Sequence, residues 1–174
     1  MARSSNTTAV GVSVERLNIR RAVAIVILML SMTAVLFGEL KKPDFSGRWE
    51  LDPAKSQLRP MTKWDNLVLA VEHREPRLNI SMTTKYSDGA DFTRRLPLTT
   101  DGKEVSMDSK GKGPRIYRAS WAGVRLVIKW NEGGATTETW ILSPDAKTMT
   151  INGSTTSADG KSETWKYVMV KKGA

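Results

Sequence analysis

The sequence contains no cysteine and only one histidine in 174 residues. Without cysteine there is no disulfide, no thiolate metal site and no cysteine nucleophile. With His73 as the single histidine, a histidine-rich zinc site is excluded, and a catalytic triad or a histidine general base has to rely on that residue. These absences remove several classes of enzyme before any pattern in the sequence is considered.

The charge of the chain is basic but scattered. The sequence has 27 basic and 18 acidic residues, which gives a net charge of +9. Four of the basic residues and one acidic residue lie before residue 39, which leaves 23 basic and 17 acidic residues in the rest of the chain. A nucleic-acid-binding protein more often gathers its basic residues on one face, with aromatic side chains between them. The composition therefore indicates solubility and a weak affinity for anionic surfaces, and no nucleic-acid partner.

A long apolar run lies near the N-terminus, at residues 22–37, and follows Arg16, Arg20 and Arg21. This is the order of a secretory signal sequence. As a helix the run spans roughly 24 Å, which is shorter than the ~30 Å hydrocarbon core of a bilayer. No Ala-x-Ala cleavage motif stands nearby. We predict that residues 1–38 are a cleaved signal peptide or an uncleaved anchor that contacts the membrane through residues 22–37.

The rest of the chain, residues 39–174, is predicted to be an exported all-β domain, periplasmic or extracellular, or held at the outer side of the inner membrane by the anchor. From residue 47 onward, apolar and polar residues alternate in short segments, a spacing typical of a sandwich or barrel. The ten predicted strands are residues 47–51, 67–73, 78–86, 91–98, 103–107, 115–121, 124–130, 136–142, 148–152 and 163–170. Asp-Gly pairs at 88–89, 101–102 and 159–160 predict short hairpins, so the strands form an antiparallel meander.

A meander of this length has two sheet edges, and pairing the first strand with the last removes both. We therefore predict a closed barrel with an apolar interior, which holds either packed side chains or one small ligand. Only residues 52–65 leave room for a short helix or lid between strands, and Pro53 and Pro60 limit any helix there.

The first predicted strand has a recognisable motif. Residues 45–51 read Phe-Ser-Gly-Arg-Trp-Glu-Leu, which resembles the Phe-x-Gly-x-Trp-x-Leu opening of lipocalins and fatty-acid-binding proteins. With the following Asp-Pro-Ala-Lys-Ser, it is also similar to an exported lipocalin-like family of soil bacteria. The resemblance implies a calycin-type up-and-down barrel, in which Gly47 lets the first strand bend and Trp49 plugs one end. Phe45 belongs to the same motif.

The sequence also departs from these families. It lacks the disulfide and the final helix usual in lipocalins, and residues 52–65 are too short for the helical pair of fatty-acid-binding proteins. The carboxylate-binding Arg-x-Tyr of the latter lies near their C-terminus, whereas Arg115-Ile116-Tyr117 lies in mid-barrel. We therefore do not transfer that role, and the resemblance supports the fold better than the ligand.

Candidates for a ligand site lie on the later strands. The aromatic candidates either line a pocket or fill the core. Arg94 alternates with Phe92 and Leu96, so its guanidinium can point inward and hold a ligand carboxylate. The competing interpretation, which we favour, is that Arg94 points to solvent. Thr93 and Arg95 mark the outward face of the strand only imperfectly, and a bulge there would turn Arg94 outward. The candidate ligand-binding residues are Arg94, Tyr117, Trp130, Trp140 and Trp165.

Other chemical candidates are weaker. His73 is either an axial haem ligand or, as we favour, a surface or rim histidine at the charged end of its strand. No loop has the oxygen spacing of a calcium site, and Ser120 lacks the surroundings of a nucleophile elbow. We therefore predict no metal, no cofactor and no enzymatic activity.

The sequence predicts that a small apolar or amphipathic molecule binds inside the barrel. The alternative is a ligand-free envelope protein that acts through its surface on a protein or polymer. An interior void of roughly 300 Å³ or more favours the first hypothesis, and a filled core favours the second.

Overall fold

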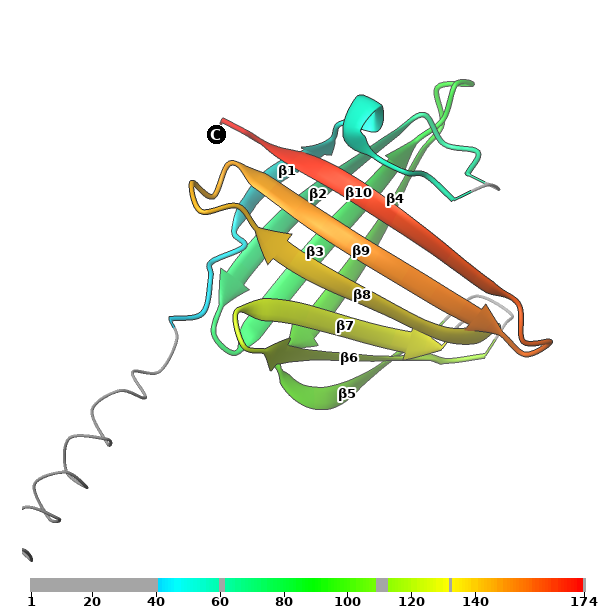
Figure 1. Cartoon of the computed structure of the whole chain (residues 1–174). Coiled ribbons are helices and arrows are strands. Elements are labelled where there is room, and N and C mark those ends of the chain that lie inside the picture. The colour runs from blue at the N-terminus through cyan, green and yellow to red at the C-terminus, as the bar shows by residue number, and fades with distance from the viewer. Residues whose placement is uncertain (1–40, 60–61, 109–112, 132, 174) are drawn as a thin grey trace, which may run out of the picture. The chain divides into compact units, whose positions relative to one another are not determined.

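Ten antiparallel strands form one sheet in the computed structural model, which describes residues 41–59, 62–108, 113–131 and 133–173 (Figure 1). The strands are β1 (Gly47–Leu51), β2 (Asn66–Arg74), β3 (Arg77–Lys85), β4 (Asp91–Thr99), β5 (Asp101–Met107), β6 (Arg115–Ala122), β7 (Arg125–Asn131), β8 (Gly134–Leu142), β9 (Thr148–Ser157) and β10 (Ser162–Lys172). A short 3₁₀ helix, η2 (Pro53–Lys55), follows β1. All ten predicted strands are confirmed close to their expected bounds, and β9 is longer than predicted.

The sheet closes on itself almost completely. The strand order is β4-β3-β2-β1-β10-β9-β8-β7-β6-β5, and β1 pairs with β10 as well as with β2. The predicted pairing of the first and last strands is therefore confirmed. Full closure is not, because β4 and β5 are the two ends of this order and do not pair with each other. We call this opening the seam.

The corner between β4 and β5 explains the seam. Only Thr100 separates the two strands. Asp101 and Gly102, predicted to form a hairpin turn, lie within β5 instead, where a register shift between Asp101 and Glu104 interrupts the pairing with β6. A bulge of this kind bends its strand. The chain therefore reverses direction without bringing β4 and β5 together.

The core includes Phe45 and Trp49 at the end of the barrel where β1 begins, which we call the closed end. The largest fully buried side chains of the whole barrel are Trp49, Phe45, Leu69, Leu78, Leu126, Met149, Ile151 and Met169. Each apolar side chain of this size stabilises the fold by about 1.5–3 kcal/mol when it leaves water. The opposite end, where residues 52–65 join β1 to β2, is the mouth.

The opening motif seals the closed end. Trp49 is fully buried, and its indole N–H donates to the carbonyl oxygen of Phe45 at 3.0 Å. The ring of Phe45 lies about 6 Å from those of Trp121 and Trp140. Gly47 has a φ of +140°, which L side chains rarely adopt, and a Cβ there would lie 2.5 Å from the side chain of Lys171. The structural roles implied for Trp49 and Gly47 are therefore consistent with their positions.

His73 lies in the closed end, and its side chain is only 3% exposed. Its Nδ1 accepts the backbone N–H of Phe45 at 3.3 Å, and its Nε2 lies 3.0 Å from Oε1 of Glu75. Of the predicted surface or rim position, the surface is wrong, because the ring packs beside Phe45 and Trp121 near the end of β2. Both ring nitrogens already have hydrogen-bond partners, so the geometry does not favour a haem ligand.

Glu75 joins the elements of the closed end. Its Oε1 also accepts the indole N–H of Trp121 at 2.8 Å, and its Oε2 accepts the hydroxyl of Thr100 at 2.7 Å. Burial opposes ionisation of Glu75, but the hydrogen bonds from Thr100, His73 and Trp121 outweigh it and lower its pKa. One carboxylate thus links β2, β6 and the corner beside the seam.

Residues 1–40 lie outside the described residues. The predicted leader at 1–38, with its apolar run at 22–37, therefore stays a prediction. In the part of the chain that is described, no helix has the length and apolar character needed to cross a membrane.

Candidate functional site

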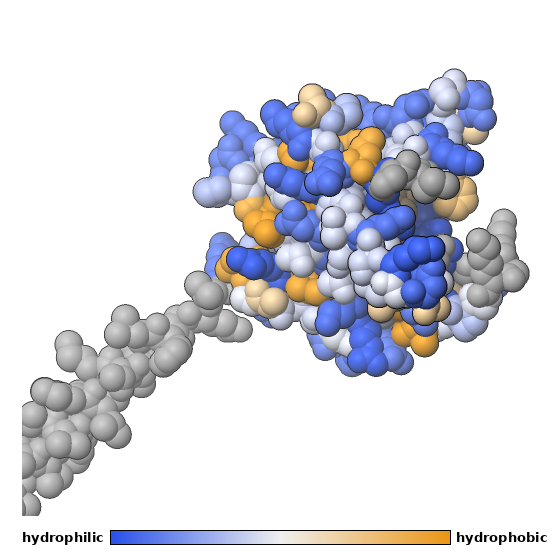
Figure 2. Space-filling model, turned by 45° about the vertical axis from the view of Figure 1, so that its right-hand side comes forward, coloured by the Kyte–Doolittle hydropathy of each residue, from blue (hydrophilic) through white to orange (hydrophobic). Residues whose placement is uncertain are grey.

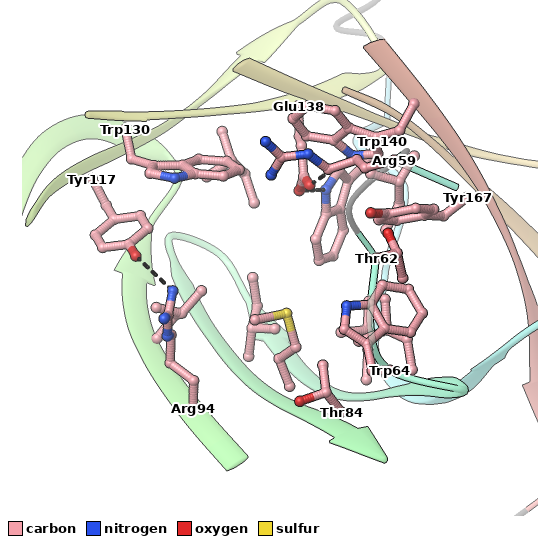
Figure 3. Close-up of a pocket in the computed structure, with 18 of the residues that line it drawn as sticks. Arg59, Thr62, Trp64, Thr84, Arg94, Tyr117, Trp130, Glu138, Trp140 and Tyr167 are labelled. Carbon is pink, nitrogen blue, oxygen red and sulfur yellow. Dashed lines mark hydrogen bonds between the residues drawn. The ribbon is translucent and has the colours of Figure 1, made fainter. Parts of the chain in front are cut away.

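A cavity of about 440 Å³ lies inside the barrel and reaches the mouth (Figure 3). Apolar side chains from five strands form much of its wall: Leu67, Leu69, Ile80, Met82, Leu96, Ile128 and Ile151. Arg59, Thr62, Lys63 and Trp64, from the segment between β1 and β2, line the mouth. The volume is in the range of small-molecule sites, about 300–1,000 Å³.

All five candidate ligand-binding residues line this cavity: Arg94, Tyr117, Trp130, Trp140 and Trp165. The aromatic residues combine both predicted roles, since three of them are buried in the core and also face the void. The outward interpretation of Arg94 is wrong. β3 and β4 pair in register without a bulge, and Arg94 lies opposite Met82, which also lines the cavity.

Among the residues that the structure describes, Arg94 has one polar partner. Its Nη1 donates to the hydroxyl oxygen of Tyr117 at 3.4 Å (Figure 3). The ring of Tyr117 in turn stacks on Trp130, with the ring centres 5.9 Å apart. Because Arg94 is on β4 and Tyr117 is on β6, this hydrogen bond crosses the seam. Within the described residues, no carboxylate forms an ion pair with Arg94, so most of its N–H donors are available to an anion.

Glu138, on β8, is a second charged group in the cavity wall. Its Oε2 accepts the indole N–H of Trp140 at 3.1 Å, and its Oε1 accepts that of Trp165 at 3.3 Å. Burial raises the pKa of Glu138, and the two indole hydrogen bonds and the charge of Arg59 only partly oppose it. Burial and the neighbouring Glu138 also raise the pKa of Tyr167.

Arg59 lies beside this group at the mouth. Its guanidinium is 4.7 Å from the ring centre of Trp165 and pairs with Glu163 at 3.1 Å. Trp64 lies next to Tyr167, with ring centres 5.8 Å apart in an edge-on arrangement. The segment between β1 and β2 therefore places the guanidinium of Arg59 and the ring of Trp64 at the mouth, in addition to Lys63.

The sequence analysis did not single out Glu138, Arg59, Trp64 or Tyr167. The signal for Glu138 was available, since it lies two residues before Trp140 and period-two alternation puts both side chains on the same face of a strand. Arg59 and Trp64 lie in an irregular segment, so no periodicity assigns their side chains to the interior.

The arrangement is suited to binding. It provides a guanidinium with free donors, a carboxyl group and an apolar wall between them. No group of three or more histidine, aspartate or glutamate side chains placed to hold a metal ion occurs among the described residues.

No protein-family model matches the sequence, and no curated protein matches it. Solved structures do match. The zebrafish ileal bile acid-binding protein complexed with cholic acid is 18% identical over 74% of this chain and 98% of its own, with a TM-score of 0.50.

Two further structures are similar. A secretory abundant heat soluble protein from Ramazzottius varieornatus is 10% identical over 78% of this chain and 100% of its own, with a TM-score of 0.54. The fatty acid transporter REP1-NXSQ is 9% identical over 75% of this chain and 98% of its own, with a TM-score of 0.53. At such identities the likeness concerns the fold. The ten-stranded barrel of this chain is similar in fold to the barrels of the bile acid-binding protein and the fatty acid transporter.

Proposed function

We propose that this protein binds a small amphipathic molecule inside the barrel, with an anionic group at Arg94 and an apolar body along the cavity wall. The observation that supports the proposal most strongly is the guanidinium of Arg94. It faces a largely apolar cavity of about 440 Å³, and its one polar contact within the described part of the chain is the 3.4 Å hydrogen bond to Tyr117.

The energetics favour an anion at this position. A charged group beside an apolar void loses hydration, and an opposite charge that hydrogen-bonds to it restores the loss. Hydrogen bonds between a guanidinium and a carboxylate are roughly twice as strong as neutral ones. The remainder of the ligand gains about 0.8 kcal/mol for each methylene that it buries against the wall.

The surface alternative has less support. The cavity exceeds the ~300 Å³ that favours a ligand over a filled core. On the face shown in Figure 2, apolar residues form small separate patches among polar ones. The names of two similar structures, a bile acid-binding protein and a fatty acid transporter, describe small amphipathic ligands, and neither names an enzyme.

We also propose that the barrel works outside the inner membrane, as a member of the exported bacterial lipocalin-like family. The support is the order of Arg16, Arg20 and Arg21 before the apolar run at 22–37. Fractionation of cells, followed by N-terminal sequencing of the protein, tests this. Recovery of the intact chain in the cytosol would contradict it.

Ligand displacement tests the proposed binding. The full-length protein, stripped of bound lipid, is titrated with anilinonaphthalene sulfonate, which is then displaced by dodecanoic acid or by dodecanol. We expect the acid to bind about tenfold more tightly than the alcohol, because only the acid pairs with Arg94. Arg94→Met removes that difference.

Arg95→Met is the matched control, since Arg95 is on the same strand, is exposed and does not line the cavity. We expect it to leave the preference for the acid unchanged. Absence of any displacement from the unaltered protein would contradict interior binding. If Arg94→Met prefers the acid over the alcohol as strongly as the unaltered protein does, the proposed role of Arg94 is contradicted.

A further inference from the structure

The two charged groups of the cavity lie apart. In Figure 3, Arg94 and Tyr117 are on one side, and Glu138 with Trp140 and Tyr167 is on the other. Apolar side chains of the cavity wall lie between the two groups. A molecule that reaches Arg94 with one end and extends along the wall therefore brings its other end toward Glu138.

Glu138 has unused capacity as a hydrogen-bond acceptor. An ionised carboxylate offers about four lone-pair positions. The two indole N–H groups of Trp140 and Trp165 occupy one position on each oxygen. Among the described residues, no lysine or arginine forms an ion pair with Glu138. The nearby Arg59 pairs with Glu163 instead.

The surroundings of Glu138 strengthen any further hydrogen bond that its carboxylate accepts. Trp140, Trp165 and Tyr167 are each less than a tenth exposed, so little water is available to the carboxyl group from that side. A hydrogen bond to a charged group in such surroundings is stronger than the same bond in water. A hydroxyl or ammonium group on the ligand would provide it, and the aromatic rings also favour an ammonium.

Resting on the proposed function, we propose that Glu138 accepts a hydrogen bond from the far end of the ligand. The ligand class is then an amphipathic acid with a second polar group, a hydroxyl or an ammonium, remote from its acid group. Glu138 selects this class from plain fatty acids, and Arg94 binds the acid group common to both.

A ligand with an acid group at each end is the competing outcome, because Arg59 is also near the far end. Arg59, however, already pairs with Glu163 and lies over the ring of Trp165. A second carboxylate would also lie close to Glu138 and be repelled by it. We therefore expect diacids to bind more weakly than plain acids.

Binding of a matched series tests the proposal. For each chain length from octanoic to hexadecanoic acid, calorimetry on the full-length protein compares the plain acid, its ω-hydroxy and ω-amino derivatives and the corresponding diacid. We expect the derivative with the correct donor to bind about tenfold more tightly than the plain acid at the chain length that spans the cavity. The hydroxy and amino derivatives distinguish the two possible donors.

Glu138→Gln keeps the size of the side chain and removes its charge. We expect it to reduce the preference for the ω-donor over the plain acid at least threefold. Glu72→Gln is the control, because Glu72 is exposed and does not line this cavity. We expect it to keep the full preference.

The outcomes separate this proposal from the one on which it rests. If no acid binds the unaltered protein, the proposed function fails. If plain acids bind but no ω-donor binds more tightly, or a diacid binds most tightly, the role of Glu138 fails alone. If Glu138→Gln does not fold, the ligand series on the unaltered protein still decides.

Discussion

The closed end and the cavity each contain a glutamate that accepts an indole N–H bond, yet the pKa values of the two carboxyl groups shift in opposite directions. At the closed end, Glu75 accepts bonds from a hydroxyl, an imidazole and an indole, and its pKa is lowered. In the cavity, Glu138 accepts bonds from two indoles, and its pKa is raised. A hydrogen bond from a tryptophan indole therefore does not by itself decide whether the pKa of a carboxyl group rises or falls.

Exposure and the number of donors explain the difference. The side chain of Glu75 is 40% exposed, so it keeps part of its hydration, and its three donors outweigh the effect of burial. Glu138 has two donors, and the loss of water outweighs them. The closed end satisfies its polar groups from within the protein. The cavity leaves binding capacity that a ligand can use.

The largest expected effect concerns packing. Phe45→Ala should lower the free energy of unfolding by about 3–5 kcal/mol, because Phe45 is fully buried among aromatic rings. Met82→Ala, in the cavity wall, should lower the free energy of unfolding by less. We expect about 2 kcal/mol, the lower end of the range for such substitutions, or below, because Met82 already faces a void. Urea denaturation measures both. An equal loss of unfolding free energy for the two variants would mean that the closed end and the cavity wall are packed alike.

A smaller effect is expected for Glu75→Gln, about 1–2 kcal/mol at neutral pH, because some of its three donors lose a partner and water replaces part of the loss. The pKa of Glu75 is lowered on folding, so its ionised form stabilises the protein above the ordinary glutamate value of 4.5. The stability difference between the two proteins should therefore shrink as the pH falls below that value.

Thermal unfolding at a series of pH values measures this difference. Glu104→Gln, the same change at an exposed ion pair with Arg118, serves as a control with little expected effect at neutral pH. A difference for Glu75→Gln that stays constant down to acid pH would argue against the assigned hydrogen bonds.

The smallest effect is expected for Glu138→Gln, with the opposite dependence on pH. Because folding raises the pKa of Glu138, the unaltered protein loses stability as the pH rises from 4.5 through the raised value. The glutamine variant does not undergo this loss. Its stability relative to the unaltered protein should therefore improve as the pH rises above 4.5. If the stability of both glutamine variants, relative to the unaltered protein, changed with pH in the same direction, the contrast between Glu75 and Glu138 would be contradicted.

Much of the fold follows from local patterns in the sequence, and the seam does not. Alternation located every strand, and the need to remove sheet edges predicted the pairing of β1 with β10. The pair Asp101-Gly102 indicated a reversal of the chain, which occurs. A reversal does not require the two strands to pair. Here β5 pairs with β6 and not with β4, and its register shifts beside the same Asp101-Gly102 pair.

The site was predictable only in part, for a similar reason. Alternation places Arg94 inside the barrel, but the exposed polar side chains on either side of it suggested a bulge. Pairing with the whole length of β3 keeps β4 regular. The carboxyl group of Glu138 could have been assigned to the interior by the same alternation. Its partner Trp165 is 27 residues away in the chain, so no local pattern connects them.

The most direct test of interior binding is a crystal structure of the full-length protein with dodecanoic acid. We expect the alkyl chain in the cavity and the carboxylate within hydrogen-bonding distance of the guanidinium of Arg94, about 2.7–2.9 Å. An alkyl chain on the outer surface, or a carboxylate at Arg59 with Arg94 still bound to Tyr117 alone, would contradict the account.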